Sequence, residues 1–210
     1  RIISLLVKMK KFLLIAFLTV LLYATGVYAV PDFYIVEDHV NGSSSAGQTL
    51  SGQTFSVNNN GTTNLDINFT GYTLTKGNDQ LSISSLGNIT NMDNGTTQTP
   101  TFSVVIPTQQ KPGLYTGTLT ATSNASTTDT VTINVNVTST YSVSTTPASE
   151  INLGSISLNT TKTDLLFNIT NTGNDSLTNV SFGFSESGFN LQANKTNFIL
   201  AFNETETMKF

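Results

Sequence analysis

The sequence predicts an all-β fold, and three observations lead to that prediction. Apolar residues alternate with polar ones over runs of about five to nine residues, the pattern of strands with one buried face. Clusters of Asn, Gly and Pro separate these runs. Charged residues make up only 10% of the chain, and Thr, Ser, Asn and Gly stand in their place. Such a composition favours short strands and polar turns over helices.

The alternation is clearest in four segments of the chain. They are residues 65–70, 101–106, 114–122 and 130–138. Shorter runs at Phe33–Glu37, Thr54–Val57 and Leu81–Ile83 bring the total to about seven strands before residue 139. That number of short strands is typical of an immunoglobulin-like β-sandwich, and the last three segments would be its strands E, F and G.

Tyr115 lies just past the Lys111-Pro112-Gly113 turn, at the start of the predicted strand F. Immunoglobulin-like folds often place a corner tyrosine at this point, with its hydroxyl bonded to the backbone upstream. Ordinary core packing explains an apolar-face tyrosine equally well. The sequence leaves both interpretations of Tyr115 open.

The N-terminal segment has the features of a secretory signal peptide. Lys8, Lys10 and Lys11 precede an apolar run over residues 12–22, and Val27-Tyr28-Ala29 offers small residues for a cleavage site. We expect residues 1–29 to be this signal helix, with translation starting at Met9 and cleavage after Ala29. An uncleaved signal anchor is the alternative. Both interpretations place the rest of the chain outside the cytoplasm, as an extracellular or cell-surface protein.

The second half of the chain repeats the pattern of the first at an offset of about 110 residues, the length of one sandwich domain. The matched residues are Phe55, Gly61, Leu65 and Leu81 with Phe167, Gly173, Leu177 and Leu191, and Asn94-Gly95-Thr96 and Phe102 with Asn203-Glu204-Thr205 and Phe210. This predicts one β-sandwich over residues 30–139 and a second over residues 140–210. The second is expected to be incomplete, because Phe210 falls where its strand E should begin.

Two segments carry a resemblance to a known group of proteins. They are Phe-Asn-Ile-Thr-Asn-Thr-Gly-Asn-Asp-Ser-Leu-Thr-Asn-Val at 167–180 and Pro-Gly-Leu-Tyr-Thr-Gly-Thr-Leu at 112–119. The chain over 31–210 resembles CARDB-like and alpha-galactosidase-associated immunoglobulin-like modules of archaeal and bacterial exported surface proteins. The resemblance implies a structural role and brings no catalytic residues with it.

Asn-x-Ser/Thr sequons, the acceptor motif for N-glycosylation, are about twice as frequent as random order of this composition would give. The thirteen begin at Asn41, Asn60, Asn68, Asn88, Asn94, Asn124, Asn136, Asn159, Asn168, Asn174, Asn179, Asn194 and Asn203. Asn68, Asn136 and Asn168 are expected to point outward from their strands. The alternative is a polar Asn/Thr surface in which sequons are by-products.

Few residues are available for chemistry. The chain has no cysteine, no tryptophan and one histidine. His39 follows Glu37 and Asp38, but neighbours on a strand point to opposite sides, so the three do not converge. We expect no catalytic residue, metal site or cofactor, and hence no enzyme. The aromatic residues most open to a sugar-stacking role are Phe33, Tyr34, Phe69 and Tyr72, and most of them fall at core-facing positions.

These observations favour a non-catalytic structural or adhesive part of an exported cell-surface protein. Its expected partners are other copies, envelope proteins and glycans, with the membrane reached only through the signal segment or a C-terminal anchor. The net charge of −4 argues against nucleic acid. The alternative is a carbohydrate- or protein-binding accessory or spacer module of a secreted enzyme.

Overall fold

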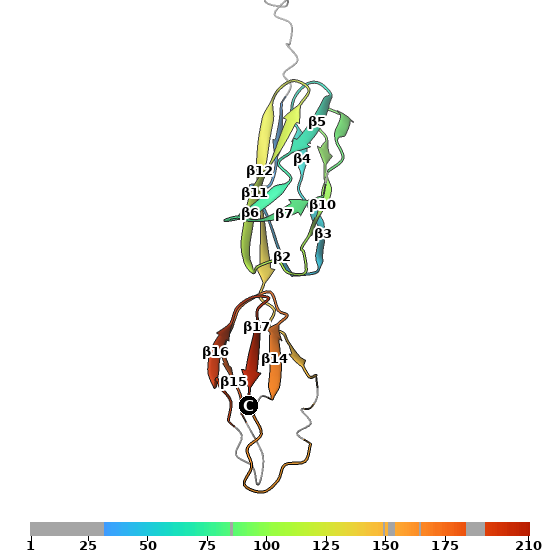
Figure 1. Ribbon diagram of the computed structural model, residues 1–210. Helices are drawn as coiled ribbons and strands as arrows, with labels where there is room; N and C mark the ends of the chain where they lie inside the picture. Colours follow the sequence, from blue (N-terminus) through green and yellow to red (C-terminus); the bar gives the residue numbers. More distant parts are fainter. Residues whose placement is uncertain (1–31, 85, 149, 151–153, 164, 184–191) are drawn as a thin grey trace, which may run out of the picture.

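The computed structural model describes residues 32–210 except 85, 149, 151–153, 164 and 184–191 (Figure 1). Every regular element in these residues is a β-strand, as the sequence predicts. None of the described residues belongs to a helix long and apolar enough to cross a membrane. The predicted signal segment, with its expected cleavage site at Ala29, lies outside the described residues, and so does Leu191.

Residues 32–138 form the first unit, which contains strands β1 to β12. The strands are β1 (Phe33–Ile35), β2 (His39–Ser45), β3 (Thr49–Thr54), β4 (Val57–Asn59), β5 (Leu65–Thr70), β6 (Thr73–Lys76), β7 (Asp79–Ile83), β8 (Ile89–Met92), β9 (Thr97–Gln98), β10 (Thr101–Val105), β11 (Gly113–Ser123) and β12 (Thr128–Thr138). One sheet has the order β2-β12-β11-β6-β7-β10-β3, with β5 paired to β11 and β8 to β5. A smaller sheet has the order β1-β4-β9. Most pairs are antiparallel, whereas β2 runs parallel to β12.

The core of the first unit lies between these layers and follows the alternation of the sequence. In β12 the side chains of Val131, Ile133, Val135 and Val137 are buried, and their neighbours face outward. Strands from both ends of the large sheet contribute to the same cluster. In the middle of the cluster the ring of Phe55 meets that of Phe69 edge-on, with centroids 5.6 Å apart. Burial of these apolar side chains makes the main favourable contribution to the folding free energy of the unit.

The first unit has twelve strands where the sequence predicts about seven, because β2, β3, β6, β8 and β9 were not predicted as separate strands. Residues 54–57 were expected to form one strand, but β3 ends at Thr54 and β4 begins at Val57, with the buried Phe55 between them. The strand β2 was not predicted, because its sequence His-Val-Asn-Gly-Ser-Ser-Ser lacks apolar alternation. Its extended form comes from pairing with β12 across seven residues, a tertiary contact that no local pattern contains.

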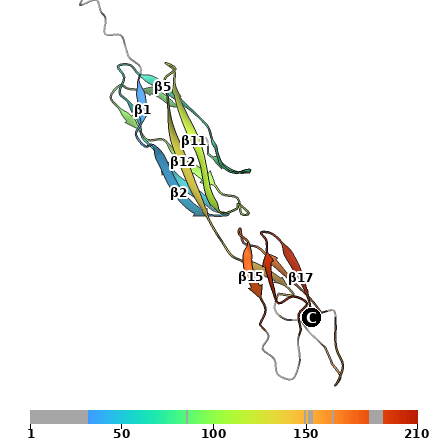
Figure 2. The same ribbon diagram turned by 90° about the vertical axis from the view of Figure 1, so that its left-hand side faces the viewer.

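The second unit, residues 143–210, contains five strands. They are β13 (Val143–Thr146), β14 (Leu166–Asn171), β15 (Leu177–Ser181), β16 (Asn197–Leu200) and β17 (Thr205–Lys209). β13, β14 and β17 form one sheet and β15 and β16 another. Ile169, Leu200 and Met208 are buried between them. The two units follow one another end to end along the chain (Figure 2).

The two units share strand registers. Asn58 of β4 pairs with Thr97 of β9, and Thr170 of β14 pairs with Thr205 of β17. Leu65 pairs with Met92 in the first unit, as Leu177 pairs with Leu200 in the second. The predicted match of Leu65 with Leu177 therefore agrees with the strand pairing.

One match in the predicted repeat is wrong by a residue. The sequence comparison aligned Asn94 with Asn203, but Gly95 and Asn203 are the residues that share a left-handed backbone, with φ of 71° and 57°. The next carbonyls, of Thr96 and Glu204, accept hydrogen bonds from Asn59 N and Asn171 N respectively. Asparagine adopts the left-handed region more readily than most other non-glycine residues, so residue identity alone misaligned the turn.

Candidate functional site

The outer face formed by β2, β12 and β11 is polar and nearly free of charge. Outward residues of β12 are Thr130, Thr132, Asn134 and Asn136, and those of β11 include Thr116 and Thr118. Hydrogen bonds cross this face from strand to strand. Thr116 Oγ1 donates to Asn134 Oδ1 over 3.0 Å, and Asn134 Nδ2 donates to Asn41 Oδ1 over 3.0 Å. The face therefore presents hydroxyl and amide groups.

Three sequons lie on this face or beside it. Asn41 on β2, Asn136 on β12 and Asn68 on β5 all have exposed side chains. Eight further sequon asparagines are exposed, and they are Asn60, Asn88, Asn94, Asn124, Asn159, Asn179, Asn194 and Asn203. Eleven of the predicted glycosylation candidates therefore have the accessibility that a glycan requires.

Two sequons depart from this expectation. Asn168 lies on the outward side of β14, opposite the buried Ile169, but its side chain is half-buried and its Oδ1 accepts a hydrogen bond from Thr207 Oγ1 at 2.8 Å. Asn174 is 1% exposed, and its Nδ2 donates to two carbonyls, those of Gln110 and Thr138. A glycan would have to replace one hydrogen of that amide. Asn174 is thus unsuited to carry one in this conformation.

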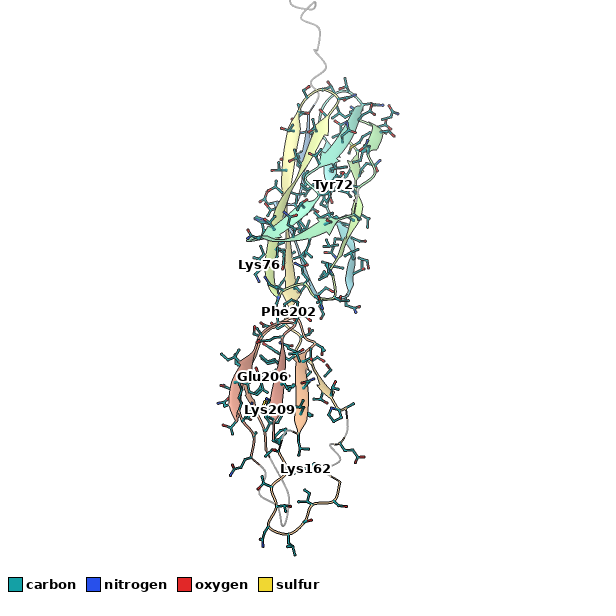
Figure 3. The ribbon with its side chains drawn as sticks, viewed as in Figure 1. Tyr72, Lys76, Lys162, Phe202, Glu206 and Lys209 are labelled. Carbon is teal, nitrogen blue, oxygen red and sulfur yellow. The ribbon has the colours of Figure 1, made fainter. Side chains whose placement is uncertain are left out.

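Asn174 lies at the junction of the two units. Gln110 belongs to the loop between β10 and β11, and Thr138 is the last residue of β12. On its other side, Asn174 Oδ1 accepts hydrogen bonds from the backbone and hydroxyl of Thr140, at 2.6 and 3.0 Å. Phe202, from the turn between β16 and β17, also lies at this junction (Figure 3).

Tyr115 forms the tyrosine corner that was one of its two predicted interpretations. Its side chain is fully buried and its hydroxyl donates to the carbonyl of Lys111 at 2.8 Å. Gln110 Nε2 donates to the same hydroxyl at 2.7 Å. The Nζ of Lys76 lies 5.9 Å from the centre of the tyrosine ring, within the range of a cation–π contact. The corner fixes the loop before β11, which is also the loop that Asn174 contacts.

The aromatic residues considered for sugar stacking divide between core and surface. Phe33 and Phe69 are buried. Tyr72 is half-buried and donates its hydroxyl to the carbonyl of Phe69. Tyr34 is exposed, at 43%. Of these four rings only Tyr34 is exposed, so they do not together form the platform of several rings that sugar recognition on a sheet would need.

The residues around His39 do not form a site. Glu37 accepts hydrogen bonds from Ser56 N and Ser56 Oγ, whereas His39 is an exposed residue at the start of β2. Across the part of the chain that the structure describes, no three His, Cys, Asp or Glu side chains are grouped as a metal site would require.

Sequence reasoning missed the structural part played by three asparagines. Asn59, Asn171 and Asn174 are buried polar residues, and each is surrounded by polar turn residues that predict exposure. The available signal was the repeated position of Asn59 and Asn171, each two residues before the glycine of its turn. The sequence Asn174-Asp175-Ser176 is a sequon, and for that reason Asn174 was included among the glycosylation candidates.

Comparisons with known proteins give no family. A scan against protein-family models finds no match, and neither does a search of curated proteins. Among solved structures, the chain is similar to a family 123 glycoside hydrolase from Clostridium perfringens, with 14% identity, TM-score 0.43, and coverage of 52% of this chain and 27% of the hydrolase. It is also similar to a PapD-like domain of human CEP192, with 12% identity, TM-score 0.38, and coverage of 50% and 84%.

A third similarity is to the CsuC-CsuE chaperone-tip adhesion subunit complex from Csu pili of Acinetobacter baumannii. It has 8% identity and TM-score 0.37, and covers 84% of this chain and 89% of that one. At such identities these structures say nothing of activity. The sheet order and the tyrosine corner of the chain itself support the fold. The described residues have an all-β fold, and the first unit is an immunoglobulin-like β-sandwich.

Proposed function

We propose that this chain is a non-catalytic structural or adhesive part of an exported, glycosylated cell-surface protein. The observation that carries the proposal is the uncharged outer face of β2, β12 and β11 with exposed sequon asparagines on and around it. A surface of hydroxyl and amide groups remains hydrated without strong electrostatic attraction to other molecules. Glycans attached at Asn41, Asn68 and Asn136 would extend from this side of the sandwich.

The N-terminal residues and the repeat support the same proposal. A signal peptide cleaved after Ala29 would deliver the chain across a membrane. Two units with common strand registers are what a tandem array of modules is built from. The resemblance to CARDB-like and alpha-galactosidase-associated modules favours the same class of exported protein.

A spacer module of a secreted enzyme is the second candidate. It is favoured by the end-to-end arrangement of the units, because a spacer holds its neighbours at a distance (Figure 2). This function makes no use of the exposed sequons. Glycosylation and cell-surface location therefore distinguish the two candidates.

The test is the intact mass of the native protein, measured separately in cell-envelope and culture-medium fractions. We expect the protein in the envelope, starting at Val30 and heavier than its amino-acid sequence by the mass of attached glycans. Recovery only from the medium, at the mass of the unmodified sequence, would contradict the proposal and favour the spacer module.

A further inference from the structure

The segment that joins the two units is held along its length. β12 ends at Thr138 and β13 begins at Val143, so residues 139–142 connect them. Ser139 Oγ donates to Asp175 Oδ2 at 2.9 Å, and the backbone N of Asn174 donates to the carbonyl of Thr140 at 3.0 Å. The carbonyl of Ser142 accepts from Thr172 N at 2.9 Å. A short Ser/Thr-rich connection is thus ordered by the turn that follows β14.

Asn174 extends this contact from the connecting segment to the body of the first unit. Its Nδ2 donates to the carbonyls of Gln110 and Thr138, each at 3.0 Å, while its Oδ1 accepts both hydrogen bonds from Thr140. A primary amide has two hydrogens to donate and two acceptor positions. All four are used, and the side chain is 1% exposed.

The partners of Asn174 in the first unit are themselves fixed. Gln110 donates through its Nε2 to the hydroxyl of the buried Tyr115, which in turn donates to the carbonyl of Lys111. The Gln110 carbonyl is therefore held in place by the tyrosine corner. On the other side, Gly173 allows the turn to approach closely, because a Cβ at this position would lie 2.3 Å from the carbonyl oxygen of Thr140.

We propose that Asn174 holds the two units in one orientation and makes their junction stiff. Neighbouring domains joined by a short segment move relative to each other unless something opposes the motion. Here any rotation of the second unit withdraws Nδ2 from the Gln110 carbonyl and leaves buried donors and acceptors without partners, which is unfavourable. The two units then behave as one rigid body, rather than as two units that rotate about a flexible connection.

The orientation of the units can be measured with two spin labels. The chain has no cysteine, so Gln80→Cys on β7 and Thr178→Cys on β15 give one exposed attachment site in each unit. Pulsed electron–electron double resonance then reports the distribution of distances between the labels. With native Asn174 we expect a single narrow distribution.

Substitution of Asn174 should broaden the distribution of distances between the two labels. Asn174→Asp keeps the size of the side chain, but a carboxylate has no hydrogen to donate to the Gln110 and Thr138 carbonyls. Asn174→Ala removes all four hydrogen bonds. In both variants we expect the single peak to be lost and replaced by a broad range of distances. Asn68→Ala removes an exposed sequon asparagine on β5, at the end of the first unit away from the junction (Figure 1), and should retain the narrow distribution.

Two outcomes would overturn the proposal. One is a broad distribution of label distances in the protein with native Asn174. This outcome can be observed even if the Asn174 variants do not fold. The other is a narrow distribution, unchanged in position, in folded Asn174→Asp and Asn174→Ala proteins. Amide hydrogen exchange on the same samples establishes that each unit is folded, so that unfolding is not mistaken for motion between units.

Discussion

Asn59 and Asn171 form the same hydrogen bonds in the two units. The Nδ2 of each donates to the carbonyl four residues ahead, Thr63 at 2.9 Å and Asp175 at 2.8 Å. It also donates to the strand opposite, at the carbonyl of Met92 or of Leu200, at 2.9 and 3.1 Å. The Oδ1 of each accepts from the glycine two residues ahead. Both side chains are fully buried, so each unit is organised around one polar residue inside its turn.

Replacement of Asn59 by alanine should therefore destabilise the first unit. The Asn59→Ala variant leaves the Thr63 and Met92 carbonyls and the Gly61 N–H without their side-chain partner, which we expect to lower the free energy of unfolding by about 3 kcal/mol. Chemical denaturation followed by far-ultraviolet circular dichroism measures the change. The neighbouring Asn60→Ala is the matched control, because Asn60 is exposed. Equal stability of the two variants would contradict the structural part assigned to Asn59.

The Tyr115 hydroxyl gives a second stability prediction. Tyr115→Phe keeps the buried ring and removes only the hydrogen bonds to the Lys111 carbonyl and from Gln110 Nε2. We expect a loss of about 1–2 kcal/mol, typical of a buried hydrogen bond whose partners remain. Tyr34→Phe is the control, since Tyr34 is on the surface and its change should stay within about 0.5 kcal/mol. If both changes are small, the tyrosine corner contributes little to this fold.

Gly117 in the middle of β11 is predicted to accept no side chain. An added Cβ would lie 2.3 Å from the carbonyl oxygen of Thr73 and 2.9 Å from the Leu74 side chain. Gly117→Ala must push β6 away from β11, and we expect it to destabilise the unit by about 1–3 kcal/mol. Gly87→Ala has open space around the new methyl group and serves as the control. Thermal unfolding of both variants measures the difference in their stability. If β6 can shift freely, the two variants should be equally stable.

Glycosylation should differ between sequons according to their exposure. In a host that modifies Asn-x-Ser/Thr, we expect glycans at Asn68 and Asn136, whose side chains are exposed, and none at Asn174, whose amide hydrogens are both bonded. Mass spectrometry of proteolytic glycopeptides gives the occupancy of each site. A glycan on Asn174 in the folded protein would show that the junction opens or forms only after modification. Unmodified Asn68 and Asn136 beside other occupied sequons would show that exposure does not decide occupancy.

The strand content of the first unit could be predicted where one face is apolar. In β11 and β12 the alternation of Thr and Asn with Val, Ile and Leu specifies strand, face and burial at once. The same reasoning did not reach β2, whose serines and asparagine give no period. Its structure depends on the hydrogen bonds that β12 offers to it. An edge strand with little apolar surface is defined by its neighbour.

The candidate site divides in the same way. Sequons such as Asn41 and Asn136 are visible in the sequence, and their exposure follows from the side of the strand they occupy. Asn174 carries an equally good sequon, yet the structure buries it. Whether a turn asparagine faces water or a second unit depends on which carbonyls approach it, and Gln110 lies 64 residues away along the chain.

The sequence by itself determined that this protein is all-β, built from repeated units and poor in groups for catalysis. The first and third properties follow from composition and from a period of two, and the second follows from residues matched about 110 positions apart. All of these can be recognised without knowing how the strands are arranged. Only the tertiary structure decided that Asn59 and Asn171 are buried, that Tyr115 makes the corner and that Asn174 joins the units. A buried polar side chain is stabilised by partners brought to it from distant segments, so its role exists only once those segments have met.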